Sequence, residues 1–167
     1  MLSGDVSGEV GADTSTAIIV GENDHDRAGA SVAIVNDVNG DGYDDLVIGA
    51  FAEDAGGSQA GAAYLVLGPA AGTIGLADAD AKLIGEVGED YAGLVVAAAG
   101  DANGDGFGDF YVTAPGYDGG FSDVGATYLM HGPVSEDTDL SFANVRYVGV
   151  GNGEESGASV ANAGDFN

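Results

Sequence analysis

The stretch that decides the fold is NDVNGDGYDDLVIGA, which runs from Asn36 to Ala50. Acidic and amide side chains crowd its first half, and an apolar run follows directly. A second stretch, GDANGDGFGDFYVTA from Gly100 to Ala114, has the same order of features. Carboxylates packed side by side at the start of a strand repel one another, so something cationic is expected to offset them.

The chain repeats itself with one constant period and no insertion. The repeat predicts four segments: the end of one repeat (1–28), two complete repeats (29–92 and 93–156) and the start of a further one (157–167). We therefore expect the chain to be a window from a longer array. The shift by 64 aligns Asp37 with Asp101 and Asp165, Asn39 with Asn103 and Asn167, and GAAYLVLGP (residues 61–69) with GATYLMHGP (residues 125–133).

Each period contains four short runs rich in Val, Ile, Leu and Tyr, bounded by Gly, Asn and Asp, which predict strands. A four-stranded sheet of this size cannot bury both its faces alone and needs neighbours. We therefore predict an all-β fold of four-stranded antiparallel blades, arranged as part of a β-propeller or as an open linear stack. In the first complete period the expected strands are Ala30–Asn36, Asp45–Ala50, Ala62–Leu67 and Ala81–Gly85.

The acidic loops have the spacing of a metal-binding loop. If Asp37 is position 1, oxygen-bearing side chains stand at positions 1, 3, 5 and 9, glycine stands at position 6, and the carbonyl of position 7 is a fifth oxygen. Oxygen ligands alone, roughly six to eight with water, suit Ca²⁺ better than Mg²⁺. The candidate ligands are Asp37, Asn39, Asp41, Tyr43 and Asp45; Asp101, Asn103, Asp105, Phe107 and Asp109; and Asp165 and Asn167 in a third, incomplete loop.

Runs of Asp, Asn and Gly also form ordinary turns, and that alternative stays open for any single loop. Two loops with the same five positions favour Ca²⁺. The loops lack His and Cys, which argues against zinc or copper. Position 12 is Ile48 or Val112 rather than Glu, so the loops are not EF-hands.

Composition excludes several classes of function. The chain has 28 acidic residues against three Lys or Arg, a formal net charge of −25. Nucleic acid and anionic membranes need basic residues, so neither is an expected partner. No apolar run reaches the roughly 18 residues that a membrane span needs. The sequence also has no Cys nucleophile, no recognisable Ser-His-Asp arrangement and no phosphate-binding glycine loop, so we expect no enzymatic activity.

These motifs resemble the FG-GAP repeat, which is known from the seven-bladed propeller of integrin α subunits and from many secreted bacterial proteins. The resemblance rests on DVNGDGYDDLVIGA (residues 37–50), DANGDGFGDFYVTAP (residues 101–115) and GAAYLVLG (residues 61–68). It implies a β-propeller with Ca²⁺ in the hairpin loops, and an extracellular or cell-surface location in a secreted, bacterial protein. The FG element reads AG at residues 28–29, and the GAP element reads GAF at residues 49–51.

Three functions remain open from the sequence. The first is a calcium-stabilised adhesion or structural module that associates with itself through blade faces or strand edges, in an array or filament. The second is an accessory domain of a secreted enzyme. The third is a propeller that binds a protein or glycan ligand.

Overall fold

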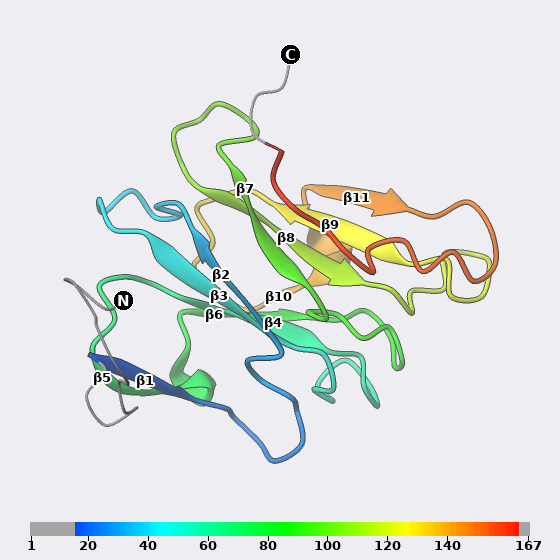
Figure 1. Ribbon diagram of the computed structural model, residues 1–167, viewed down its shortest axis with the longest axis horizontal. Coiled ribbons are helices and arrows are strands. Elements are labelled where there is room, and N and C mark those ends of the chain that lie inside the picture. The colour runs from blue at the N-terminus through cyan, green and yellow to red at the C-terminus, as the bar shows by residue number, and fades with distance from the viewer. Residues whose placement is uncertain (1–15, 164–167) are drawn as a thin grey trace, which may run out of the picture.

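The computed structural model of the protein describes residues 16–163 and leaves residues 1–15 and 164–167 outside the description. Strands dominate it, with two short 3₁₀ helices at Leu76–Asp78 and Leu140–Phe142. The strands, labelled in Figure 1, are β1 (Ala17–Val20), β2 (Ser31–Val35), β3 (Asp45–Ala50), β4 (Ala62–Val66), β5 (Gly72–Gly75), β6 (Ala81–Ile84), β7 (Val96–Gly100), β8 (Asp109–Ala114), β9 (Ala126–Met130), β10 (Thr138–Asp139) and β11 (Val145–Val148).

Two antiparallel blades form the body of the molecule. The first blade has the strand order β6-β4-β3-β2 and the second has β11-β9-β8-β7. The acidic loops join the first two strands of each blade, β2 to β3 and β7 to β8, as hairpins. The predicted all-β fold of four-stranded antiparallel blades is therefore confirmed, and each of the four expected strands lies within one residue of its predicted ends.

The structure adds two short parallel pairings that the sequence did not predict. β5 pairs with β1, and β10 pairs with β6 as a fifth strand of the first sheet. Each of these pairings joins a segment of one repeat to the last strand of the repeat before it. The segments are too short to predict as strands from sequence, and the strand with which each pairs lies in another repeat.

The main core lies between the two blades. The side chains at alternate positions of each strand point to opposite faces, so each blade presents one apolar face to the other. This cluster includes Val35, Val47, Leu65 and Leu83 of the first blade and Val96, Phe110, Val112 and Tyr128 of the second. A second cluster covers the other face of the first blade, where Ile48, Tyr64 and Leu76 pack with Ile19 of β1.

The chain approaches itself closely where one repeat passes to the next. Gly61 has a φ of +78°, and a Cβ on it would lie 2.2 Å from the carbonyl oxygen of Ala92. The counterpart Gly125 has a φ of +74°, and its Cβ would lie 2.2 Å from the carbonyl oxygen of Ser156. Glycine at these two positions therefore lets the connection between repeats lie directly on the preceding blade.

Within residues 16–163 the blades do not close into a ring, and in Figure 1 they lie one against the other with β11 at the outer margin of the second. The described part of the chain also has no helix of the length and apolar character that a membrane span requires.

Candidate metal centres

The two acidic loops lie at corresponding ends of the two blades. Each loop connects the first strand of its blade to the second. Positions in each loop are counted below from Asp37 and from Asp101. The glycine at position 6, Gly42 or Gly106, has a φ of +90° or +93°. This conformation strongly favours glycine and turns the chain back toward the second strand of the blade.

The side chains at positions 1, 3 and 5 form one hydrogen-bonded ring with the loop backbone. The Asp37 carboxylate accepts the backbone N–H groups of positions 4, 5 and 6 at 2.6, 3.0 and 2.7 Å. The Asn39 Nδ2 group donates to Asp41 Oδ2 at 2.9 Å, and Asp41 Oδ1 accepts the N–H of Tyr43. Every one of these bonds recurs in the second loop between the corresponding atoms. The ring therefore fixes the three side chains within one short loop.

The carboxylate at position 9 is buried and braces the loop against the blade. Asp45 is 2% exposed, and its two oxygens accept the N–H groups of Val38 and Gly68 at 2.7 and 2.8 Å. Asp109 is fully buried and has equivalent bonds, from the N–H groups of Ala102 at 2.7 Å and Gly132 at 3.0 Å. Position 9 therefore has a structural role in the hairpin. A carboxylate oxygen that accepts one hydrogen bond keeps a further lone pair.

Two acids of the first loop have pKa values shifted in opposite directions. Burial raises the pKa of Asp45, and the charges of Asp41 and Asp37 raise it further, although the N–H groups of Gly68 and Val38 act the other way. Desolvation also raises the pKa of Asp37, but the N–H groups of Gly42, Gly40 and Asp41 together bring it below its ordinary value. In the second loop, the bonds from the Phe107 N–H and the Asn103 side chain lower the pKa of Asp105. The pKa of Asp37 in the first ring and that of Asp105 in the second are therefore lowered, while the pKa of the buried Asp45 is raised.

The two loops also contact each other. The backbone N–H of Gly108 donates to the carbonyl oxygen of Asp37 at 2.7 Å. The Phe107 ring lies against Gly40, where a Cβ would come within 2.8 Å of the ring. A change in one loop can therefore reach the other across the blade interface.

The chemistry of these donors fits a hard cation, because carboxylate and amide oxygens line each ring and no nitrogen or sulfur ligand stands among them. Within residues 16–163, however, no three carboxylate or imidazole side chains converge on one point as a metal cluster does. The acidic oxygens are directed to backbone amides instead. Metal binding by the residues proposed from the sequence therefore stays a prediction, and Asp165 and Asn167 lie outside the described residues.

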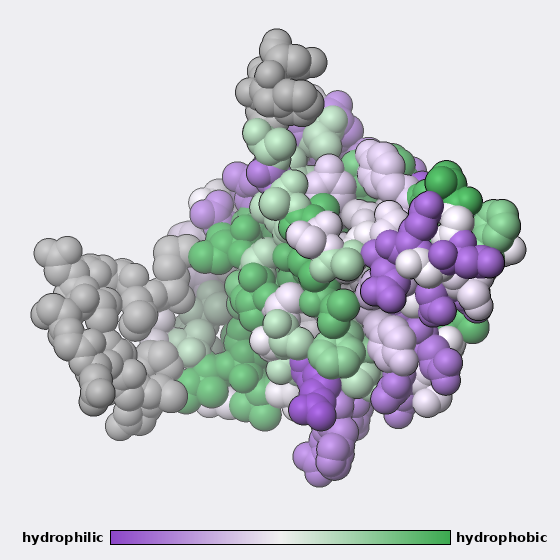
Figure 2. Space-filling view, turned by 45° about the vertical axis from the view of Figure 1, so that its right-hand side comes forward, coloured by the Kyte–Doolittle hydropathy of each residue, from purple (hydrophilic) through white to green (hydrophobic). Residues whose placement is uncertain are grey.

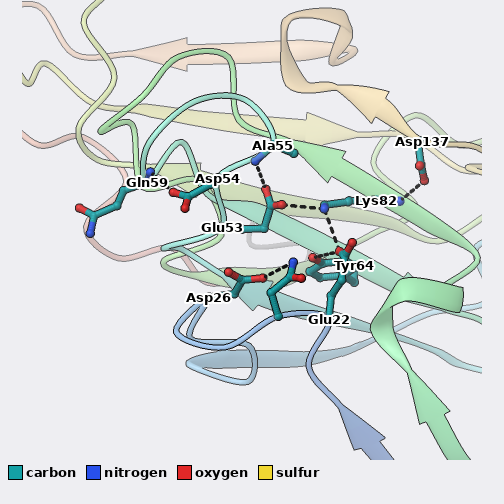
Figure 3. A network of polar contacts seen from close by, with 10 residues as sticks. Glu22, Asp26, Glu53, Asp54, Ala55, Gln59, Tyr64, Lys82 and Asp137 are labelled. Atoms are coloured by element: carbon teal, nitrogen blue, oxygen red, sulfur yellow. Dashed lines mark hydrogen bonds and ion pairs between the residues drawn. The ribbon is translucent and has the colours of Figure 1, made fainter.

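Sequence reasoning missed a second polar centre, at the outer edge of the first blade (Figure 3). Lys82 of β6 forms ion pairs with Glu22 at 2.8 Å and Glu53 at 2.7 Å, and its ammonium group lies 5.4 Å from the centre of the Tyr64 ring. The Tyr64 hydroxyl donates to Glu22 Oε2 at 2.7 Å. The bonds from Lys82 and then Tyr64 lower the pKa of Glu22, despite its partial burial. Glu22 belongs to the preceding repeat, so this network ties two repeats together.

The second blade has a related network at the same place. Arg146 of β11 forms an ion pair with Glu86 and lies 5.0 Å from the centre of the Tyr117 ring, while the Tyr128 hydroxyl donates to Glu86 Oε1. The sequence carried a signal for it. Lys82 and Arg146 are two of the three cationic residues of the chain and stand one repeat apart, as do Tyr64 and Tyr128.

Comparison with known proteins agrees with this geometry. Residues 28–66 and 92–130 match the FG-GAP repeat, and both matches contain an acidic loop with the strand that follows it. The chain contains two FG-GAP repeats. It is also 35% identical to integrin alpha pat-2 of Caenorhabditis elegans, over 75% of this chain and 11% of that protein. The FG-GAP chain thus spans about a tenth of the length of this relative, to which it is distantly similar.

The match supports three general statements. FG-GAP repeats often bind Ca²⁺ and are typically non-catalytic. FG-GAP domains similar to those of integrin α chains are typically extracellular.

Proposed function

We propose that the chain is a calcium-binding, non-enzymatic structural or adhesion module of an extracellular protein, in which successive FG-GAP repeats stack on one another. The observation that supports this function best is the repetition of one oxygen-lined loop, bond for bond, in two neighbouring blades. Asp and Asn are common in ordinary turns, but here the same three ionisable or amide side chains recur at the same three positions of both loops.

In this proposal each loop holds one Ca²⁺ ion. Asp37, Asn39, Asp41 and Asp45 would hold the first ion together with the carbonyl oxygen of Tyr43. The second loop would use Asp101, Asn103, Asp105 and Asp109 with the carbonyl oxygen of Phe107, and Asp165 and Asn167 would begin a third site. The bound ion supplies positive charge, which offsets the repulsion among the carboxylates of each loop.

The charge of the whole chain makes this contribution large. With a net charge of −25, the compact fold brings many carboxylates together and is destabilised by their repulsion. A cation that binds only the folded loops adds its binding free energy to the stability of the fold. It would also favour the charged form of Asp45, whose pKa is raised by burial and by neighbouring acids.

The test is thermal unfolding of the full chain in Ca²⁺ and in a chelator, with calorimetric titration of Ca²⁺ into the chelated and dialysed protein. We expect two strong sites and a melting temperature that falls by about 5–10 °C, on the order of 2–3 kcal/mol, without Ca²⁺. Asp41→Ala should abolish one site. Asp24→Ala, which removes an exposed acid outside the loops, should keep both. Equal melting temperatures in Ca²⁺ and chelator would overturn the calcium proposal.

The proposed partners are other repeats of the same kind, met through blade faces or strand edges. Val32 and Ile34 of β2 are each 55% exposed, and Ile18 and Val20 of β1 are also exposed. Figure 2 shows apolar residues gathered across the middle of one face of the molecule, with hydrophilic residues at its lower and right-hand margins. Exposed apolar area of this kind favours a protein contact. A protein or glycan ligand on an adhesive surface is the alternative, and an accessory role beside a secreted catalytic domain is a further one.

A further inference from the structure

The short parallel pairings follow one rule in both places where they occur. Residues 72–76 and their counterparts 136–140 are called tie segments here. In the first pairing Ile74 stands opposite Ile19 and Gly75 opposite Val20. In the second, one repeat further along the chain, Thr138 stands opposite Leu83 and Asp139 opposite Ile84. Each tie segment therefore adds itself, in the same register, to the outer strand of the preceding blade.

Each tie segment is anchored by one buried leucine. Leu76 and Leu140 stand at the same position of the repeat, open the two 3₁₀ helices, and are almost fully buried. Leu76 packs in the cluster that contains Ile19, and Leu140 packs in the cluster that contains Leu83. A side chain helps to hold the second tie, because Asp137 Oδ1 accepts the backbone N–H of Lys82 at 2.8 Å.

β11 is the outer strand of the second blade and ends its sheet. It stands at the same place in the repeat as β1 and β6, but no strand pairs with its outer edge in the part of the chain that the structure describes. The consequence is visible in exposure. Leu83 of β6 is completely buried, whereas its counterpart Tyr147 of β11 is 51% exposed.

We propose that the outer edge of β11 is a strand-acceptor site for the tie segment of another FG-GAP repeat. The incoming segment would pair in parallel with Tyr147 and Val148, as Thr138 and Asp139 pair with Leu83 and Ile84. The partner is an extended stretch followed at once by a leucine, which buries itself beside Tyr147. Such pairing uses backbone hydrogen bonds for affinity and the leucine for specificity.

The path of the chain after β11 supports this partner. The N–H of Ser156 donates to the carbonyl of Val124 at 2.9 Å, as that of Ala92 does to Ala60 at 2.8 Å. The backbone N–H of Gly149 likewise donates to the carbonyl of Gly125, as that of Gly85 does to Gly61. The segment that follows β11 therefore contacts the second blade through the same hydrogen bonds as the segment between the two blades forms with the first. A further repeat would begin at the corresponding position.

This inference deepens the self-association part of the proposed function and does not depend on calcium in the loops. It is tested with a lengthened chain, in which a second copy of residues 104–156 follows Asn167 and continues the repeat without a break. Amide hydrogen exchange of residues 145–148 is measured in the original and lengthened chains, in calcium buffer. Exchange of β6 in the same samples is the internal reference.

We expect exchange at the outer edge of β11 to slow by about tenfold or more in the lengthened chain. The control is a lengthened chain whose appended counterpart of Leu140 is aspartate, which leaves the two original blades untouched; there β11 should exchange as in the original chain. Equal exchange in the original and lengthened chains, with β6 protected in both, would overturn the acceptor site. So would protection that survives the aspartate, or a β6 edge that is itself unprotected. Failure of the calcium proposal would appear instead as a melting temperature insensitive to the chelator.

Discussion

The acidic loops and the outer strands of the two blades differ in how closely the contacts of one repeat match those of the next. At the loop edge the two repeats agree bond for bond, because the ring of positions 1, 3 and 5 is built within one short stretch of consecutive residues. At the outer edge the same positions carry different contacts. Lys82 pairs with two glutamates, whereas Arg146 pairs with one, since Tyr117 stands where the first repeat has Glu53. The hydrogen bonds formed within one short stretch are therefore the same in both loops, whereas the ion pairs, whose partners come from other segments, differ between the two blades.

The largest expected effect comes from the buried carboxylate at position 9. Asp45→Ala and Asp109→Ala each leave two backbone N–H groups without their acceptor, and a buried unpaired group costs about 1–3 kcal/mol. We expect each variant to lose about 3–5 kcal/mol of unfolding free energy in urea. The losses should be equal within about 1 kcal/mol, because the bonds are the same in both loops.

Asp78→Ala, which removes an exposed acid elsewhere, is the control for the change in net charge. Losses that differ widely between the two loops would show that the bond-for-bond agreement hides a difference in their surroundings. The contact of Phe107 with Gly40 is the first place to look for it.

The same distinction explains what the sequence could predict. The strands of each blade and the acidic loops were predictable, because runs of Val, Ile, Leu and Tyr and an Asp-Asn-Asp-Gly pattern act over a few neighbours. The tie segments were not, because GTIG (residues 72–75) becomes a strand only through its pairing with β1. The network of Lys82 was predictable in part, since the cation and Tyr64 both recur in the next repeat, but its acid partners come from other segments. Whether the loops bind an ion stays a prediction.

The second prediction compares the removal of Lys82 with the removal of Arg146, the cations of the two ion-pair networks. Lys82→Met leaves Glu53, which is almost fully buried, without its cation, and removing one member of a buried pair is costly. We expect a loss of about 3 kcal/mol for Lys82→Met. Arg146→Met removes the same charge from a more exposed pair and should cost about 1 kcal/mol or less.

Urea unfolding of the two single variants checks the difference, and each is the charge-matched control of the other. Glu53→Gln combined with Lys82→Met should recover part of the loss, because no buried charge is then left unpaired. Similar costs for the two cations would mean that the extra glutamate of the first blade contributes nothing.

The smallest effect concerns an acid that differs between the repeats. Asp26 accepts a hydrogen bond from the Asn23 side chain at 3.2 Å. Its counterpart Asp90 has Val87 where the first repeat has Asn23, and receives only the backbone N–H of Val87. Burial, with the charges of Glu86 and Asp118, raises the pKa of Asp90 to about 6, although that N–H acts to lower it.

Because the pKa of Asp90 is higher in the folded chain than in the unfolded one, its ionisation lowers stability as pH rises from about 4 to about 6, and the loss persists above that range. Val87→Asn should supply the missing donor from an exposed position, lower this pKa and stabilise the chain at pH 7 by about 1 kcal/mol. The gain should vanish below pH 4, where the carboxyl is protonated in both states. Urea unfolding of the wild type and of Val87→Asn at pH 7 and pH 3.5 measures this gain in stability. Asp90→Asn is the control, because its side chain cannot ionise. A gain of the same size at both pH values would mean that the asparagine acts on the turn itself, and the difference between the two repeats would then lie in the backbone rather than in the charge of Asp90.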